Sequence, residues 1–371
     1  NIADLATKAN ALCGVIRLWY GEGDVVTPDF IKAAAANALT EGRTFYEPDM
    51  RGAAALREAL ATYQSTLHGR EIGEDRSAVQ PGGMQTLHVA MMLVCDPGQS
   101  VVVVEPQWPN IRHVVTLAGG RAVSVPLDMT DRPTLDLDRL FDACDTDTAA
   151  ICFSTPANPT GWSASREELT AILEFARARG IWVISDEVYN RLWFGNERGA
   201  PSLVALAEPE DKVLTVNSFS KAWAMTGWRV GWLVHPPSVG GKLAAVTQYV
   251  NSGTAPFVQA AAATALTEGE PLVAQIRDRC RDGLDAAYET IARTDAIHLP
   301  AKPRGGMYAF FRLKGEDDSR AACAKILEAA QVGLAPGFMF GPAGRAWLRM
   351  CVCRETETVR EAGARIARAL S

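Results

Sequence analysis

Hydrophobic residues between about residues 75 and 235 fall into short runs separated by polar segments. Each run is rich in β-branched residues and ends in Gly, Pro, Asn, Asp or Ser, as strands do where they meet a turn. The runs are continuously apolar, which is typical of strands buried on both faces of a mainly parallel sheet. The pattern predicts strands at residues 100–106, 149–155, 180–187, 212–218 and 230–236.

Amphipathic segments lie between the predicted strands, and the segment 163–180 is the clearest of them. Ser165 and Glu168 have the spacing of a capping box, and Gly180 supplies a stop signal. The apolar side chains on its expected buried face are Leu169, Ile172, Leu173 and Phe175. Because strands alternate with helices, the sequence predicts an α/β fold built in layers.

The pattern changes after about residue 285. A long helical segment at 277–294 leads to two short strands, at 307–313 and 346–353, and then to a helix at 357–370. A chain of 371 residues also exceeds the size at which one core usually keeps growing. We therefore expect a large α/β domain at 45–285 and a smaller α+β domain formed by 1–44 and 286–371.

Composition narrows the class of protein. The chain is 48% hydrophobic and 22% charged, with a net charge of −6, which disfavours a nucleic acid or an anionic membrane as partner. Its longest apolar runs fall short of the roughly 20 residues that a membrane helix needs. The N-terminal residues lack the layout of a signal peptide. Eight cysteines without a C-x-x-C pair favour reduced core thiols in a cytoplasmic protein over disulfides or a metal site.

Polar side chains follow the predicted strands, where ligands of open α/β sheets bind. A double glycine at Gly82 and Gly83 precedes a helix, and Trp108 follows the first of the five strands. Each residue alone has an ordinary explanation, such as a turn, a helix cap or a solvated lysine. The side chains at the other strand ends are Asn158, Asp186, Tyr189, Ser218, Ser220 and Lys221.

Together these residues suit one kind of ligand. A double-glycine helix start offers backbone N–H groups to a phosphate, a carboxylate suits a ring nitrogen, and a lysine suits an aldehyde. Pyridoxal phosphate carries a phosphate, a ring nitrogen and an aldehyde. Its enzymes bind it through a lysine Schiff base and a carboxylate partner to the ring nitrogen. The sequence therefore indicates a pyridoxal-phosphate site, with no metal.

Five segments carry a resemblance to a known family: "SFSKAWAMTGWRVGW", "NPTGW", "SDEVY", "YGEGDVVTP" and "FYEPDMRGAAALREALA". Together they resemble the class I and II aminotransferases, which are fold-type I pyridoxal-phosphate enzymes. The resemblance extends over nearly the whole chain, and the segments occur in the family's order. It implies a three-layer, mainly parallel large domain with a smaller α+β C-terminal domain.

The resemblance implies the catalytic roles. Lys221 resembles the lysine that forms the aldimine with the cofactor and then moves a proton between substrate and cofactor. Asp186 resembles the carboxylate that pairs with the pyridine nitrogen and keeps the ring an electron sink. Asn158 and Tyr189 resemble the donors to the ring hydroxyl oxygen.

The resemblance also implies how the cofactor is held. Trp108 resembles the ring that stacks on the pyridine. Tyr46 resembles a tyrosine that reaches the phosphate from a second subunit, which implies a homodimer with shared active sites. The other phosphate contacts expected are the backbone of Gly83 and Met84 and the side chains of Ser218, Ser220 and Arg229.

Substrate contacts are implied at Arg349, Asn158 and Gly21. Arg349 resembles the arginine that grips the substrate carboxylate through two parallel hydrogen bonds, and Gly21 resembles a backbone contact at the entrance. Three aromatic residues, Trp19, Tyr20 and Trp162, suggest a bulky rim and favour an aromatic or aliphatic amino donor over aspartate.

The function implied is transfer of an amino group from an L-amino acid to a 2-oxo acid by a ping-pong mechanism. The same residues and fold also support carbon–sulfur β-elimination and other pyridoxal-phosphate reactions, because the cofactor carries the chemistry. A pyridoxal-phosphate-binding regulatory protein is a more remote alternative. The donor, the acceptor and the choice between these reactions stay open at this point.

Overall fold

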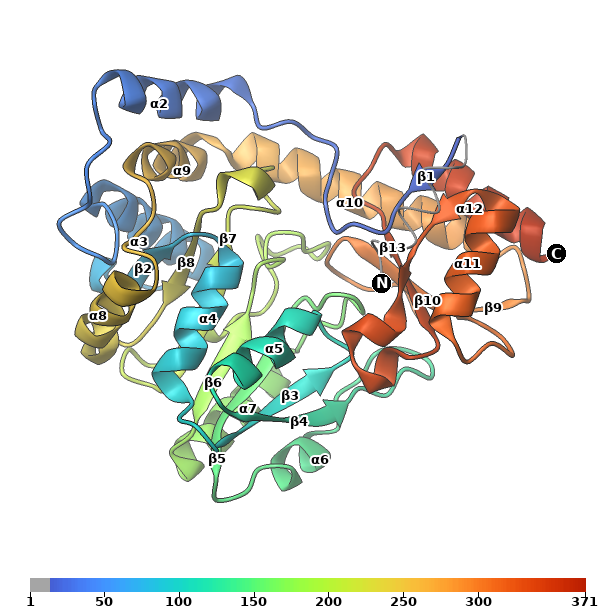
Figure 1. Ribbon diagram of the computed structural model, residues 1–371, viewed down its shortest axis with the longest axis horizontal. Coiled ribbons are helices and arrows are strands. Elements are labelled where there is room, and N and C mark those ends of the chain that lie inside the picture. The colour runs from blue at the N-terminus through green and yellow to red at the C-terminus, as the bar shows by residue number, and fades with distance from the viewer. Residues whose placement is uncertain (1–13) are drawn as a thin grey trace.

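A seven-stranded sheet forms the centre of the molecule (Figure 1) in the computed structural model, which describes residues 14–371. The strand order is β2-β8-β7-β6-β5-β3-β4, and every pairing is parallel except the two that β8 makes. The prediction of a mainly parallel sheet is confirmed. The strands are β2 (Ser77–Gln80), β3 (Ser100–Glu105), β4 (Arg121–Pro126), β5 (Thr148–Ser154), β6 (Trp182–Asp186), β7 (Val213–Ser218) and β8 (Gly231–Val234).

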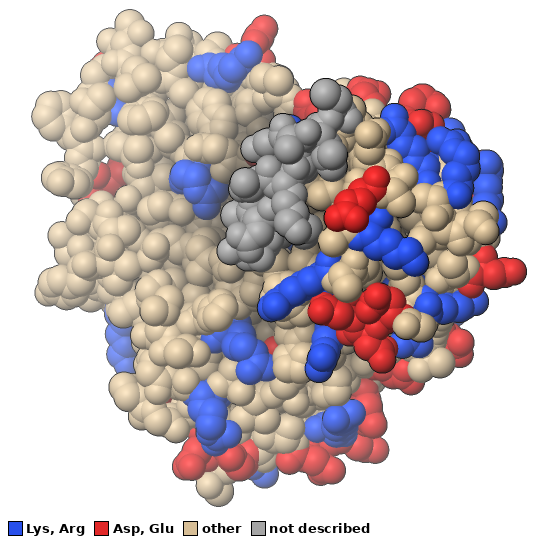
Figure 2. All heavy atoms as spheres, turned by 45° about the vertical axis from the view of Figure 1, so that its right-hand side comes forward, with Lys and Arg blue, Asp and Glu red and all other residues tan. Residues whose placement is uncertain are grey.

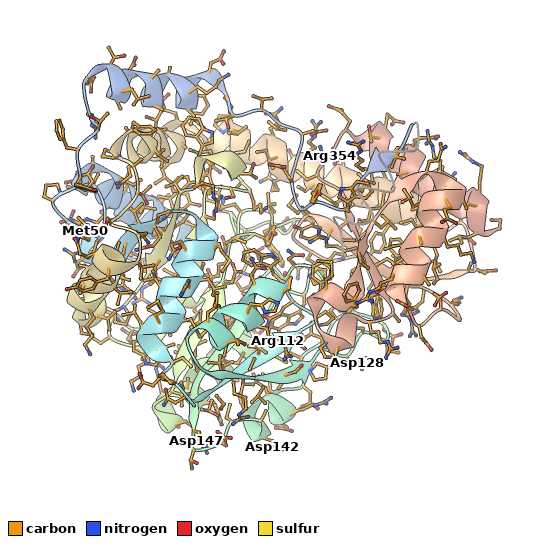
Figure 3. All side chains as sticks on the ribbon, viewed as in Figure 1. Met50, Arg112, Asp128, Asp142, Asp147 and Arg354 are labelled. Atoms are coloured by element: carbon orange, nitrogen blue, oxygen red, sulfur yellow. The ribbon has the colours of Figure 1, made fainter. Side chains whose placement is uncertain are left out.

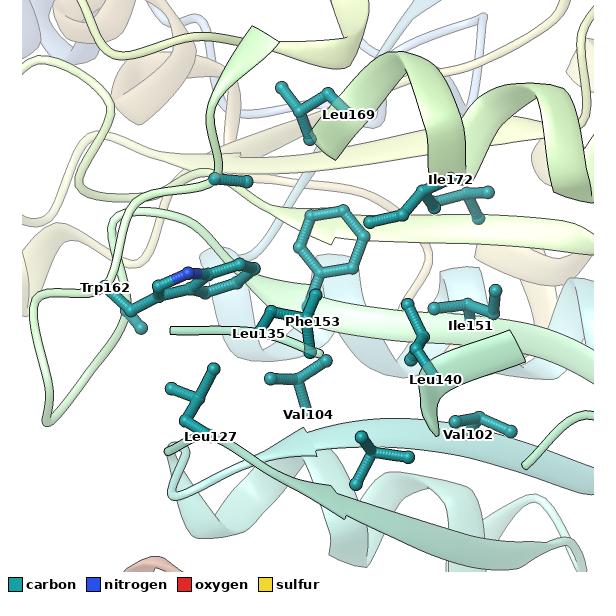
Figure 4. Packing of buried hydrophobic residues seen from close by; sticks show 14 of the residues in the cluster. Val102, Val104, Leu127, Leu135, Leu140, Ile151, Phe153, Trp162, Leu169 and Ile172 are labelled. Atoms are coloured by element: carbon teal, nitrogen blue, oxygen red, sulfur yellow. The ribbon is translucent and has the colours of Figure 1, made fainter. Parts of the chain in front are cut away.

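Helices cover both faces of this sheet. Alternate residues of β5, such as Phe153 and Cys152, belong to two different hydrophobic clusters. One cluster packs under α6 (Leu137–Asp142) and α7 (Arg166–Arg179), and the other under α4 (Gly83–Val94), α5 (Pro109–Leu117) and α8 (Gly240–Val250). Figure 4 shows Phe153 enclosed by side chains from several elements. The three-layer α/β prediction is therefore confirmed.

Helix α7 forms as its sequence predicts. The Ser165 side chain accepts the backbone N–H of Glu168, and the Glu168 side chain accepts the backbone N–H of Ser165. Gly180 ends the helix with a φ of 65°, which costs a glycine little. In Figure 3 Asp142, at the end of α6, and Asp147, directly before β5, lie at the rim of the molecule. The carboxyl ends of the strands are therefore directed away from this rim.

A second sheet of four strands has the order β12-β13-β10-β9, all antiparallel. The strands are β9 (Ile297–His298), β10 (Tyr308–Leu313), β12 (Ala335–Pro336) and β13 (Trp347–Cys351). Its hydrophobic cluster also contains side chains of α10 (Glu270–Ile291), α11 (Ser319–Ala330) and α12 (Thr356–Leu370). The short strands and the final helix predicted for this region are confirmed, and α10 begins earlier than expected.

The beginning of the described chain joins this second region, because β1 (Ile16–Arg17) pairs in parallel with β11 (Val332–Gly333). Helix α2 (Asp29–Thr40) instead packs on α9 (Pro256–Glu268), and α9 also packs on α3 (Ala54–His68). Helix α10 runs through residue 285. The domain boundaries drawn from the sequence stay a prediction.

Charges of both signs are intermingled over the side that carries the C-terminal helices (Figure 2). Ion pairs join many of them, for example Arg360 with Glu289 and Arg365 with Glu361. Within residues 14–371 no helix has the length and apolar character needed to cross a bilayer. The seven described cysteines are unpaired and buried, and Cys13 lies outside the described residues.

Gly283→Ala is expected to destabilise the fold by about 2–3 kcal/mol, because a Cβ there would lie 2.1 Å from the backbone carbonyl oxygen of Val352. Gly241→Ala, in α8, is the matched control, since a Cβ there meets nothing within 4 Å. We expect that control to be neutral or up to about 1 kcal/mol more stable. Urea unfolding of both variants measures the difference, and equal stabilities would contradict this packing.

Candidate active site

A cavity of about 450 Å³ opens at the carboxyl ends of the parallel strands, between the central sheet and β10 and β13. It collects almost every residue that the sequence singled out, although they are spread over more than 300 positions. A larger cleft of about 770 Å³ contains none of the predicted cofactor-binding or substrate-binding residues, although Trp162 borders it. The predicted residues that line the smaller cavity are Gly21, Gly83, Met84, Trp108, Asn158, Asp186, Tyr189, Ser218, Ser220, Lys221, Arg229 and Arg349.

Lys221 follows β7 and points its amine into this cavity. Its Nζ donates to the backbone oxygen of Gly21 at 2.7 Å. Burial lowers the pKa of Lys221 below its usual value, and the positive charge of Arg349 lowers it further. The loop is rigidly seated, since Phe219, Trp223 and their neighbours pack into a buried cluster. The Lys221 amine therefore loses its proton more readily than an ordinary lysine does, which favours its use as a nucleophile.

Asp186 ends β6, and its side chain is 2% exposed. Among the described residues, the backbone N–H of Val188, at 3.3 Å, is its one hydrogen-bond donor. Burial raises the pKa of this carboxyl to about 7, and the Lys221 charge offsets only part of that rise. A buried carboxylate without a close cation is costly. A protonated pyridine nitrogen would supply the missing positive charge and restore an ionised Asp186, so this residue fits the cofactor.

The other end of the cavity suits a phosphate. Helix α4 begins at the double glycine, and Gly82 has a φ of 85°. This positive φ favours glycine, and the absence of a Cβ lets the Arg229 guanidinium approach the helix start, since a Cβ on Gly82 would lie 2.3 Å from its Nη2 atom. The hydroxyls of Ser218 and Ser220 lie 2.9 Å apart beside this turn. Helix N–H groups, two hydroxyls and a guanidinium form an anion site.

Arg349 projects from β13 and is 5% exposed. Its Nη1 donates to the Asn158 side-chain oxygen at 3.0 Å, and its Nη2 donates to the Trp19 backbone oxygen at 2.5 Å. Its Nε has no partner, and no carboxylate among the described residues pairs with it. A buried guanidinium held in this way is prepared for a carboxylate from a ligand.

Trp108 and Met84 form the wall nearest to α5. Trp108 is the residue directly before α5 and lines the cavity. The side-chain amide of Asn110 contacts the sulfur of Met84 at 3.1 Å. Met84 therefore has its backbone at the phosphate end while its side chain packs against the start of α5.

Tyr46 lies apart from the other predicted residues. Its side chain is 82% exposed and borders a different cavity, of about 420 Å³, with Phe45 and Asn251. A tyrosine that serves the site of a second subunit would have to project outwards in this way. Its role stays a prediction.

The predicted aromatic rim is wrong for two of its three members. Trp19 and Trp162 are 1% and 5% exposed and belong to a hydrophobic cluster beneath the sheet. Only Tyr20, 51% exposed, lines the cavity. Their indoles are large enough to fill the core, and the sequence does not distinguish that use from a rim.

Sequence reasoning missed several lining residues, above all Tyr308 and Phe340. Tyr308 lies in an apolar strand, "MYAFFRL", where it resembles any core residue. The pairing of β10 with β13, which carries Arg349, was the signal that could have found it. The remaining missed residues that line the cavity are Pro109, Asn110, Val188, Thr226 and Met339.

Known proteins are similar to this chain over nearly its whole length. The sequence profile of the family "Aminotransferase class I and II" matches residues 15–366. The arginine–pyruvate transaminase of Pseudomonas aeruginosa is 32% identical over 95% of this chain and 89% of its own. The aspartate/prephenate aminotransferase of Thermus thermophilus is 33% identical over 99% of this chain and 96% of its own.

The fold agrees as well. The structure of aspartate aminotransferase from Thermus thermophilus with maleate superposes with a TM-score of 0.90 at 31% identity, over 100% of this chain and 96% of that one. The predictions of family, fold class, enzyme class and cofactor are confirmed by these matches. The chain belongs to the class I and II aminotransferases, enzymes of fold type I that transfer amino groups with pyridoxal phosphate as cofactor.

Proposed function

We propose that this chain moves the amino group of an L-amino acid to a 2-oxo acid in two half-reactions, with Lys221 as the catalytic base. One observation carries the proposal: a single cavity is lined by Lys221, by the buried Asp186 and by Arg349, which has no carboxylate partner among the described residues. These groups suit an aldehyde, a ring nitrogen and a substrate carboxylate. Bound cofactor supplies an electron-withdrawing ring that stabilises negative charge at the substrate Cα.

Lys221 performs the proton transfers in this proposal. Its amine would hold the cofactor between turnovers, take a proton from the substrate Cα and give it to the cofactor carbon that receives the amino group. The lowered pKa of Lys221 leaves more of the amine neutral at working pH, which a base requires. Burial of the Lys221 amine limits the access of bulk water, which would otherwise compete for the proton.

The other residues bind and orient. Asp186 keeps the ring nitrogen protonated, and Asn158 and Tyr189 donate to the ring oxygen. Trp108 stacks on the ring. The phosphate is held by the backbone at Gly83 and Met84 and by Ser218, Ser220 and Arg229, while Gly21 contacts the substrate through its backbone.

Arg349→Lys is expected to raise KM for both the amino acid and the 2-oxo acid by about a hundredfold. Lysine keeps the charge but loses the planar fork that grips a carboxylate. Steady-state kinetics with both substrates measure the effect.

Arg312→Lys is the matched control for the arginine substitution, because Arg312 is an exposed arginine on the neighbouring strand β10. We expect its KM values to stay within about twofold of wild type. An unchanged KM in Arg349→Lys would remove Arg349 from the substrate site.

The donor is proposed to carry an aromatic or aliphatic side chain. Tyr20, Met339 and Phe340 line the same cavity as Lys221 and Arg349, and the Phe340 ring contacts the Arg349 guanidinium. Two relatives act on arginine with pyruvate and on aspartate or prephenate, so the donor differs within the family. A panel of L-amino acids, with pyruvate and 2-oxoglutarate as acceptors, tests this choice; preference for aspartate would contradict it.

The products of one half-reaction separate transamination from β-elimination. With an L-amino acid and no acceptor, we expect about one equivalent of 2-oxo acid per site and no ammonia. Repeated release of pyruvate and ammonia from cystathionine would instead favour a carbon–sulfur lyase. Binding of DNA by the intact chain without any turnover would favour the regulatory alternative.

A homodimer is part of the proposal. Tyr46, Phe45 and Tyr249 are each more than 80% exposed, and exposed aromatic side chains are characteristic of interfaces. If a partner covers them, Tyr46 lies at a subunit boundary and is able to reach the partner's phosphate site. Sedimentation of the holoenzyme tests this, and a monomer at micromolar concentration would contradict it.

A cytoplasmic location is the last part of the proposal. The seven described cysteines are unpaired, as expected in a reducing compartment. Titration of the denatured protein, purified without reductant, should find all eight thiols free. Oxidised pairs in the native protein would contradict the assignment.

A further inference from the structure

Tyr308 lies at the meeting point of the residues that hold the cofactor and the substrate. It is 2% exposed, and its hydroxyl oxygen is 2.9 Å from that of Tyr189. The guanidinium carbon of Arg349 lies 4.5 Å from the centre of its ring. We propose that Tyr308 is a positioning residue that orients the Tyr189 hydroxyl through its own hydroxyl and seats Arg349 through its ring. This inference rests on the proposed roles of Tyr189 and Arg349.

The hydroxyl pair has one productive arrangement. Each phenol carries one hydrogen, and either oxygen is able to donate in the pair. If the Tyr189 hydrogen points to the cofactor ring oxygen, then Tyr189 must accept from Tyr308. Two donors in series polarise one another, which makes Tyr189 the stronger donor. Tyr308 thereby fixes the direction of the Tyr189 hydrogen without touching the cofactor ring itself.

The ring of Tyr308 serves the other end of the site. The Arg349 guanidinium also lies 4.9 Å from the Phe340 ring, so two aromatic rings face it. Contacts of this kind attract a cation and restrict its orientation. The Arg349 Nε has no hydrogen-bond partner among the described residues. The rings therefore set where the guanidinium fork meets a substrate carboxylate.

Gly21 lies close to the Tyr308 hydroxyl. A Cβ on Gly21 would lie 2.2 Å from the Tyr308 hydroxyl oxygen, so only glycine leaves room for it. The backbone oxygen of Gly21 in turn accepts the Lys221 amine. Tyr308 is thus next to three parts of the site. It adjoins Gly21, whose backbone oxygen accepts the Lys221 amine, and it contacts both Tyr189 and Arg349.

Both phenols stay protonated, as a donor chain requires. Burial raises the pKa of each above the usual value of a phenol. The titratable and charged groups that face them are Arg349, Asp186, Cys351 and Cys353. The phenols themselves do not titrate in the working range. If removal of the Tyr308 hydroxyl changes how the cofactor-bound site responds to pH, that change therefore reports on the hydrogen bond between Tyr308 and Tyr189.

Titration of the holoenzyme absorbance tests the hydroxyl. The negative charge of the ring oxygen stabilises the proton on the nitrogen that joins Lys221 to the cofactor. A hydrogen-bond donor to that oxygen withdraws part of this charge, so a weaker donor lets the nitrogen keep its proton to a higher pH and raises the midpoint of the spectral transition. We expect Tyr308→Phe to raise the midpoint by roughly half a pH unit, and Tyr189→Phe to raise it more. Tyr288→Phe, which removes a hydroxyl from α10, should titrate as wild type.

The outcomes separate this inference from the proposed function. If Tyr189→Phe shifts the midpoint and Tyr308→Phe does not, Tyr308 does not orient Tyr189 while the role of Tyr189 stands. If neither shifts, the proposed role of Tyr189 fails, and the hydroxyl half of this inference fails with it.

Substrate affinity tests the ring. Tyr308→Phe keeps the ring, so KM for the amino acid should stay within about twofold of wild type, whereas Tyr308→Leu should raise it roughly tenfold with a smaller change in kcat. Thermal unfolding of both variants verifies that they fold. Equal KM values in Tyr308→Phe and Tyr308→Leu would overturn the seating of Arg349.

Discussion

Lys221→Ala is expected to lower kcat by about ten-thousandfold or more and to abolish the absorbance band of the lysine-bound cofactor. Alanine removes both the nucleophile that holds the cofactor and the base that moves the substrate proton, and losses of this size are usual for such groups. The amine concerned projects into the cavity and contacts the Gly21 backbone oxygen. Absorbance of the loaded variant and steady-state turnover measure the two effects.

Lys242→Ala is the control, because Lys242 is an exposed lysine on α8, outside the cavity. Its spectrum and turnover should equal those of wild type. Added small amines should restore part of the activity of Lys221→Ala, since they replace the missing base. Wild-type absorbance and turnover in Lys221→Ala would refute the assignment.

Asp186→Asn is expected to lower kcat by about a hundredfold to a thousandfold while the cofactor still binds. An amide does not hold a positive charge on the ring nitrogen, so the ring withdraws less charge from the substrate Cα. The exposed Asp128→Asn is the matched control and should keep wild-type turnover. Retention of full kcat by Asp186→Asn would show that this carboxylate does not act on the ring.

The same substitution changes the pH dependence of stability. Without cofactor, burial raises the folded-state pKa of Asp186 from 3.8 to about 7. The folded protein then binds more protons than the unfolded one between these values, so stability falls as pH rises from about 4 to 7. Glu187 behaves alike, with a pKa raised to about 7 by burial. Unfolding of apo Asp186→Asn should show a shallower fall than apo wild type.

The strand ends show how much of the site the sequence pattern alone could locate. The strands β3, β5, β6 and β7 have apolar centres and are buried over nearly their whole length, so the end of each one could be located from sequence. Since parallel strands share one edge, Asn158, Asp186 and Lys221 were expected together, and they line one cavity. The reversed direction of β8 left no local sign, because it depends on pairing with β2 and β7.

Side chains that act through the tertiary fold were harder to predict. Tyr308 and Phe340 belong to apolar segments and reach the cavity only because the second sheet packs against the first. Trp162 was misjudged for the converse reason, since a motif next to the site places its indole in the core. Polar residues at the strand ends indicated the site, whereas nothing in the sequence showed that Trp19 and Trp162 face the core and not the cavity.

Reduction of the holoenzyme with borohydride tests the central claim most directly, because it fixes the cofactor to the lysine that holds it. Peptide mass mapping should find the phosphopyridoxyl mass on the peptide that contains Lys221 and on no other lysine. Reduction in the presence of a saturating amino donor should leave Lys221 unlabelled. A label on another lysine, or an unlabelled Lys221 in the resting holoenzyme, would contradict the account.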